Sequence, residues 1–105
     1  MSAKHVLAVA VMAVTPVAFA AGGDAAAAKD KISMCVGCHG IPGYHTSFPE
    51  VYKVPKLGGQ HPEYIVSALQ AYKKGDRSHP SMRGIAASLS DQDMADIAAY
   101  YGAQK

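Results

Sequence analysis

The chain has 105 residues, of which half are hydrophobic, and its formal net charge at neutral pH is +2. This length predicts one small domain. A charge so near neutral gives no support for a nucleic-acid-binding protein or for strong electrostatic attraction to a membrane. The two cysteines lie in one short motif, which leaves no thiol for a disulfide elsewhere in the chain.

The N-terminus has the pattern of a secretory signal peptide. A short positive start is followed by an apolar run over residues 6–19 and by the small-residue cleavage site Ala18-Phe19-Ala20. We therefore expect residues 1–20 to be a signal peptide and residues 21–105 to form the domain. The alternative, an uncleaved membrane anchor, is disfavoured because a spanning helix needs about 20 apolar residues.

A helix is predicted next, from about Asp24 through Ile32 and on into the cysteine motif. Alanine and lysine dominate this segment and are good helix formers. The side chain of Asp24 is suited to cap the first turn of this helix.

Two cysteines and an adjoining histidine follow, in the order Cys35-Val36-Gly37-Cys38-His39. This spacing is the attachment signature of a c-type haem. On one helical turn, each thiol can form a thioether with one haem vinyl group, and the histidine that follows can ligate the iron. We predict one covalent haem c bonded to Cys35 and Cys38, with His39 as the proximal iron ligand. Because bacteria attach such a haem outside the cytoplasm, the motif and the leader together indicate the periplasm.

The rest of the chain predicts loops and helices. Residues 40–59 are rich in proline and glycine, which predicts an irregular loop without strands. Pro62 suits the first position of the next helix, which has an apolar face and ends at Gly75. A polar loop over residues 76–80 is followed by a short helix within residues 82–89.

The last helix is predicted from a cap and an apolar face. Ser90 and Asp93 have nearly the capping-box spacing. Met94, Ile97, Ala98 and Tyr101 fall on one face of the helix, which ends near Gly102.

Haem bonded at the motif has one further axial position on its iron. Met34 directly precedes Cys35 and is held on the wrong side of the ring, and Met94 lies on a helix face that packs against the core. Met82 is expected in a loop, between Pro80 and Gly84, from which it can reach the distal face. We therefore predict Met82 as the distal ligand.

Histidine is the competing type of distal ligand. His79 is three residues from Met82, and His45 and His61 are also available. A bis-histidine haem would have a lower potential, because a thioether favours the ferrous state. We expect these three histidines to be exposed or capping residues.

The chain resembles the class I c-type cytochromes, in particular the small bacterial monohaem kind that is similar to single domains of dihaem cytochromes c. The resemblance covers most of residues 21–105 and is poorest over residues 41–54. It lies in the sequences CVGCHG at 35–40, PKLGGQ at 55–60, YIVSALQAYKKGDR at 64–77 and MRGIAASLSDQDMADIAAYYG at 82–102. It implies an all-α fold in which three to four helices surround the haem and the first and last helices cross beside it. The same methionine, Met82, is the distal ligand that the resemblance implies.

The resemblance also implies surroundings for the haem. The carbonyl of Pro55 would accept a hydrogen bond from His39, and Leu57 would pack on the haem edge. Independently of the resemblance, Arg77 is a candidate partner for a haem propionate because it is a cation, with a solvated side chain as the alternative. Ala27 and Ala28 would approach the last helix closely, against Ile97, Tyr100 and Tyr101.

Two protein ligands leave the iron no open position for oxygen or a substrate. We therefore predict an electron carrier rather than an enzyme, which moves single electrons between redox proteins through brief contacts. The uncharged rim formed by Val36, Gly37, Ile41 and Pro42 suits such small interfaces. No nucleic-acid partner and no strong membrane binding after signal cleavage are expected, and no oligomeric state is predicted.

Three alternatives stay open at this point. The first is a haem subunit of a dehydrogenase or terminal oxidase complex. The second is a haem sensor or peroxidase-like protein with a labile sixth ligand. The third is a protein without haem that uses its CxxC motif for zinc binding or thiol exchange, although zinc needs about four ligands and the motif offers three crowded ones.

Overall fold

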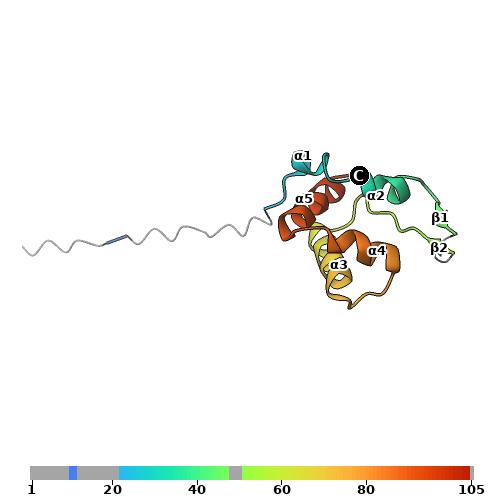
Figure 1. The fold of residues 1–105 in the computed structure, drawn as a ribbon. Helices are drawn as coiled ribbons and strands as arrows, with labels where there is room; N and C mark the ends of the chain where they lie inside the picture. Colours follow the sequence, from blue (N-terminus) through green and yellow to red (C-terminus); the bar gives the residue numbers. More distant parts are fainter. Residues whose placement is uncertain (1–9, 12–21, 48–50, 105) are drawn as a thin grey trace, which may run out of the picture.

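The computed structural model describes residues 10–11, 22–47 and 51–104. The signal peptide predicted over residues 1–20 falls almost wholly outside the described residues. The described elements are α1 (Ala25–Ala28), α2 (Ser33–His39), β1 (His45–Thr46), β2 (Tyr52–Lys53), α3 (Pro62–Lys74), α4 (Pro80–Ala87) and α5 (Asp91–Gly102) (Figure 1). In this part of the chain, no helix combines the length and the apolar character that crossing a membrane requires.

The prediction of one continuous helix from Asp24 to the cysteine motif is wrong. The Asp24 side chain does cap α1, accepting a hydrogen bond from the Ala26 amide at 2.9 Å. The helix then ends in a turn, in which the amides of Lys31 and Ile32 both donate to the carbonyl of Ala28, at 2.8 and 3.1 Å. This turn brings Ile32 into the core, where its side chain is 8 % exposed.

The prediction that residues 40–59 contain no strand is also wrong. His45 pairs with Lys53 and Thr46 pairs with Tyr52 in an antiparallel hairpin. Aromatic and β-branched residues favour such a pleated pair, and the prolines and glycines around them hid this signal in the sequence. The hairpin lies beyond α2, on the far side of the domain from α1 (Figure 1).

The core lies where α5 packs against α1 and α3 (Figure 1). The predicted crossing of the first and last helices is therefore present. The buried side chains come from the faces that their spacing predicted, and they include Ala28, Ile65, Leu69, Met94, Ile97, Ala98 and Tyr101. The chain also approaches α5 at Gly23, where a Cβ atom would lie 2.1 Å from the carbonyl oxygen of Ala95.

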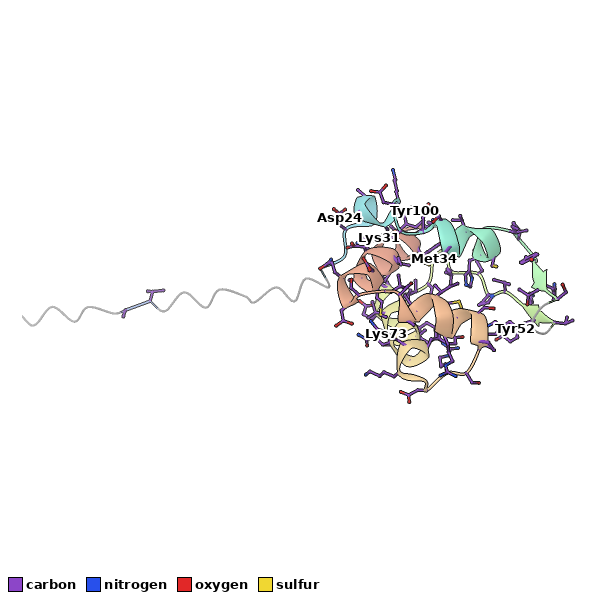
Figure 2. All side chains as sticks on the ribbon, viewed as in Figure 1. Asp24, Lys31, Met34, Tyr52, Lys73 and Tyr100 are labelled. Carbon is purple, nitrogen blue, oxygen red and sulfur yellow. The ribbon has the colours of Figure 1, made fainter. Side chains whose placement is uncertain are left out.

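Asp96 ties the N-terminal segment to α5. Its side chain is 2 % exposed. It accepts hydrogen bonds from the Asp24 amide at 2.8 Å, from Lys31 Nζ at 2.5 Å and from Gln92 Nε2 at 2.9 Å. Lys31 also contacts Asp93 Oδ1 at 2.9 Å. Figure 2 shows Asp24 and Lys31 on the side of the domain where α1 and α5 meet. A buried carboxylate is therefore fully paired at this helix crossing.

We expect Asp96→Asn to lower the Tm of the haem-loaded protein at pH 7 by about 5 °C or more. The pKa of Asp96 is lowered to about 2, first by the hydrogen bond from the Asp24 amide and then by Lys31 and Gln92. A carboxyl with a lowered pKa stabilises the fold above its unfolded pKa of about 4, and this contribution is lost as the pH falls towards 2. The Tm difference should therefore shrink between these pH values in thermal melts followed by circular dichroism.

The matched control is Asp91→Asn, which removes an exposed carboxylate in the first turn of the same helix. Its Tm should stay close to that of the wild type at every pH. A deficit for Asp96→Asn that is equally large at pH 7 and at pH 2 would contradict the ionic origin of this stabilisation.

Gly102→Ala is expected to destabilise the fold by about 1–3 kcal/mol, because the added methyl group would overpack α5 at this position. A Cβ atom on Gly102 would lie 2.5 Å from Cγ of Pro62 and 3.2 Å from the carbonyl oxygen of Gln60. Urea unfolding of the haem-loaded protein measures the loss. Gly84→Ala is the control, because a Cβ there meets nothing within 4 Å. Since Gly84 lies inside α4, this change should instead stabilise the protein by about 0.5–1 kcal/mol.

Candidate haem site

A cavity of about 460 Å³ lies between α2, the hairpin, the segment 54–60, α3 and α4. Its volume is within the usual range of small-molecule sites, about 300–1,000 Å³. The apolar part of its lining includes Val54, Leu57, Ile65, Ala68, Leu69, Ile85 and Ile97. The cavity therefore borders directly on the core that α3 and α5 form.

The α2 wall of this cavity carries the cysteine motif. Cys35, Cys38 and His39 all line the cavity, as does Met34. Cys35 is 8 % exposed, and burial raises the pKa of its thiol. Reactive dithiols need the opposite shift, because the thiolate is the nucleophile. The surroundings of Cys35 therefore do not favour thiol exchange.

His39 is held by the segment that follows the hairpin. Its Nδ1 lies 2.7 Å from the carbonyl oxygen of Pro55, which is the hydrogen bond that the resemblance implies. A carbonyl can only accept, so Nδ1 donates its proton and Nε2 keeps a free lone pair. This is how a metal-ligating histidine is commonly fixed in tautomer and orientation. Leu57, two residues further on, lines the cavity and is half-buried.

Met82 lines the same cavity. The prediction that it lies in a loop is wrong. Met82 is in the first turn of α4, which begins at Pro80. Proline at the first helical position needs no amide partner, so the helix can begin two residues before the methionine. Ile85, one turn later, also lines the cavity, so one face of α4 forms this wall.

The other possible iron ligands lie in different places. Met94 is fully buried in the core and does not line the cavity, whereas Met34 lines it from the same wall as His39. His45 and His61 are exposed and do not line the cavity.

His79 is the residue whose position sequence reasoning missed. It precedes α4 as its N-cap residue, as expected, but its side chain makes no capping hydrogen bond. Both ring nitrogens are buried and have no hydrogen-bond partner among the described residues. The ring lies edge-on against Tyr52, with 4.7 Å between the two ring centroids. Figure 2 shows Tyr52 at the hairpin. No local pattern marks such a residue, because its burial depends on the unpredicted hairpin.

Arg77 lines the cavity, with its guanidinium carbon 4.8 Å from the centre of the Tyr72 ring. Its side chain is exposed, so it can place a cation at the rim of the cavity. The residues present fit a haem: they provide apolar walls, two thiols and an oriented imidazole on one wall, a thioether on another, and a cation at the rim.

Comparison with known proteins gives the same result. The family model described as Cytochrome c matches residues 20–101. Cytochrome c-554(548) of Halomonas halodenitrificans is 45% identical over 86 residues, which cover 79% of this chain and 99% of that protein. The cytochrome subunit of sulfide dehydrogenase of Chlorobaculum tepidum is 35% identical over 68 residues, 65% of this chain and 57% of that one.

A solved structure shares the fold. The crystal structure of reduced recombinant cytochrome c4 from Pseudomonas stutzeri aligns with a TM-score of 0.62 and 39% sequence identity, and covers 79% of this chain. The chain spans 46% of the length of that cytochrome c4. The fold, the cavity with its cysteine motif and these relatives together show that the chain belongs to the cytochrome c family, as a class I c-type cytochrome with covalently bound haem c.

Proposed function

We propose that this chain is a periplasmic monohaem cytochrome that carries single electrons between redox proteins and is not an enzyme. In this proposal Cys35 and Cys38 hold the haem, while His39 and Met82 ligate its iron. The observation that carries it is that these four side chains line one cavity, from two different elements.

Each part of the site has a task that follows from its contacts. Bound haem supplies a one-electron couple between ferric and ferrous iron. The hydrogen bond from His39 to Pro55 fixes the imidazole, so the ligand need not reorient between the two iron states. Met82 on α4 would be the second protein ligand of the iron and would leave no open position for oxygen or a substrate. The apolar walls would keep water away from the haem. They would favour ferrous iron, which carries one positive charge less than ferric iron.

Contact with a redox partner would use the surface beside the cysteines. Val36 is 42% exposed and Ile41 is 49% exposed. Together with the exposed Gly37 and Pro42, they form an uncharged rim next to the covalent attachment site. Small apolar surfaces of this kind suit transient encounters.

The test is a redox titration of the protein purified from the periplasm. We expect a covalent haem that survives acid-acetone extraction, a one-electron midpoint transition, and no rapid binding of carbon monoxide by the ferrous protein. Mass spectrometry should find a mature chain that begins at Ala21 and carries one haem. Loss of the haem on extraction would refute the proposal. Rapid carbon monoxide binding would favour a sensor or a peroxidase-like protein instead.

A second candidate is a haem subunit held in a dehydrogenase complex. It is supported by the likeness to the cytochrome subunit of sulfide dehydrogenase. A free carrier should elute alone from size exclusion at physiological ionic strength. Stoichiometric copurification with a larger redox protein from the native periplasm would favour the subunit.

A further inference from the structure

His79 is a half-buried residue that lines the haem cavity, and its ring has no hydrogen-bond partner among the described residues. Both ring nitrogens are buried and make no hydrogen bond among the described residues. Leaving a buried polar group unpaired destabilises a protein, so a partner is expected in the haem-loaded protein. Because His79 lines the haem cavity, a bound haem would lie within reach to supply this partner.

The place of His79 indicates which part of the haem it meets. A second cavity of about 310 Å³ adjoins this end, and its lining is Tyr52, Tyr72, Asp76, Arg77, Ser78 and His79. Four of these residues, Tyr52, Tyr72, Arg77 and His79, line the main cavity as well. A polar space therefore borders the apolar cavity at this end.

The cysteines give the direction of the haem. Thioethers form at the vinyl groups, which are on two neighbouring pyrrole rings, and the propionates are on the other two rings. Cys35 and Cys38 therefore hold the vinyl edge at α2. No residue of α2 lines the second cavity. The end with His79 is thus the one available to the propionate edge.

We propose that His79 binds a haem propionate by donating a ring N–H to its carboxylate, next to the cation of Arg77. The inference rests on the haem-binding part of the proposed function. Arg77 is exposed and lies over Tyr72, so its guanidinium would meet a carboxylate from the rim. The His79 nitrogens are buried, so the ring would meet a carboxylate from inside the cavity after turning towards it. Asp76 also lines the second cavity, but it is exposed and adjoins Arg77.

The charge of a propionate acts on the iron. A hydrogen bond from a buried donor offsets part of the carboxylate's negative charge. Without this donor, the carboxylate would stabilise the ferric state more strongly, and the midpoint potential would fall. His79 is in this sense a positioning and tuning residue. Its effect should appear in the potential even where the fold and the iron ligands are unchanged.

The experiment compares the midpoint potentials of haem-loaded wild type, His79→Leu and His79→Asn at one pH. We expect His79→Leu to lower the potential. His79→Asn keeps an N–H donor on a shorter side chain and should stay closer to the wild type. His45→Leu is the matched control, since His45 is exposed and lines neither cavity, and its potential should not change. In the wild type, nitrogen NMR should show a His79 ring N–H that exchanges slowly with water and shifts between the ferric and ferrous states.

Each contrary outcome has a distinct meaning. If His79→Leu has the potential of the wild type, the ring merely packs against Tyr52 and the proposal is wrong. If His79→Leu becomes high-spin and binds carbon monoxide, His79 ligates the iron, and both this proposal and the assignment of Met82 are overturned. Equal covalent haem content in all variants, measured as pyridine haemochrome, separates these outcomes from a failure of haem binding itself.

Discussion

Replacing both Cys35 and Cys38 by alanine is expected to leave the exported chain without covalent haem and without cooperative folding. The domain is small, and domains of this size need a staple because they bury too little surface. Its core also borders a cavity of about 460 Å³, into which Ile65, Leu69 and Ile97 project as lining residues. Without haem, these apolar side chains would face water instead of a packed ligand.

The measurements are the pyridine haemochrome spectrum and thermal melts of the periplasmic protein. We expect the haem absorbance of the double variant to fall to background and its melt to lose its sharp transition. Ser33→Ala is the control on the same helix, since Ser33 is exposed and does not line the cavity, and it should keep a full haem content. An apoprotein with wild-type helix content and a cooperative melt would show that the haem is not part of the core.

Helix boundaries could be predicted wherever the local chemistry decides them. Pro62 opens α3, and Gly75 ends it with a φ of 89°, in the left-handed region that favours glycine. Ser90 and Asp93 form the capping box at the start of α5, with both reciprocal hydrogen bonds present. The motif residues could be located for the same reason, because five consecutive residues carry that chemistry.

Features that depend on distant parts of the chain could not be predicted in this way. The hairpin forms because two segments meet, although neither has a strong strand pattern alone. The close approach of Gly23 to α5 shows only when α1 and α5 are packed together. His79 has the ordinary sequence context of a capping residue, and its burial follows from the hairpin residue Tyr52. The residues that attach the haem, Cys35 and Cys38, could therefore be predicted from the sequence. The position of His79, at the polar end of the cavity, could not.

Met82→Ala is expected to open the iron while the haem stays attached. Both thioethers and the hydrogen bond between His39 and Pro55 lie on other walls of the cavity, so they should be unaffected. The ferrous variant should bind carbon monoxide rapidly, and the ferric variant should lose the charge-transfer absorption of a thioether–iron bond. Because a thioether favours ferrous iron, the midpoint potential should fall by on the order of 0.1 V, a fraction of the roughly 0.8 V range that axial ligands span.

Met34→Ala is the informative control, because Met34 is the other methionine that lines the cavity. It shares α2 with His39, so its sulfur is on the proximal wall, and its loss should change neither carbon monoxide binding nor the thioether absorption. If instead Met34→Ala opens the iron and Met82→Ala does not, the distal assignment is reversed. If neither variant does so, the sixth ligand is not a methionine, and His79 becomes the residue to replace next.

The placement of Met82 on a helix rather than in a loop makes its loss easier to interpret. A helical side chain is held by the packing of α4 against α3.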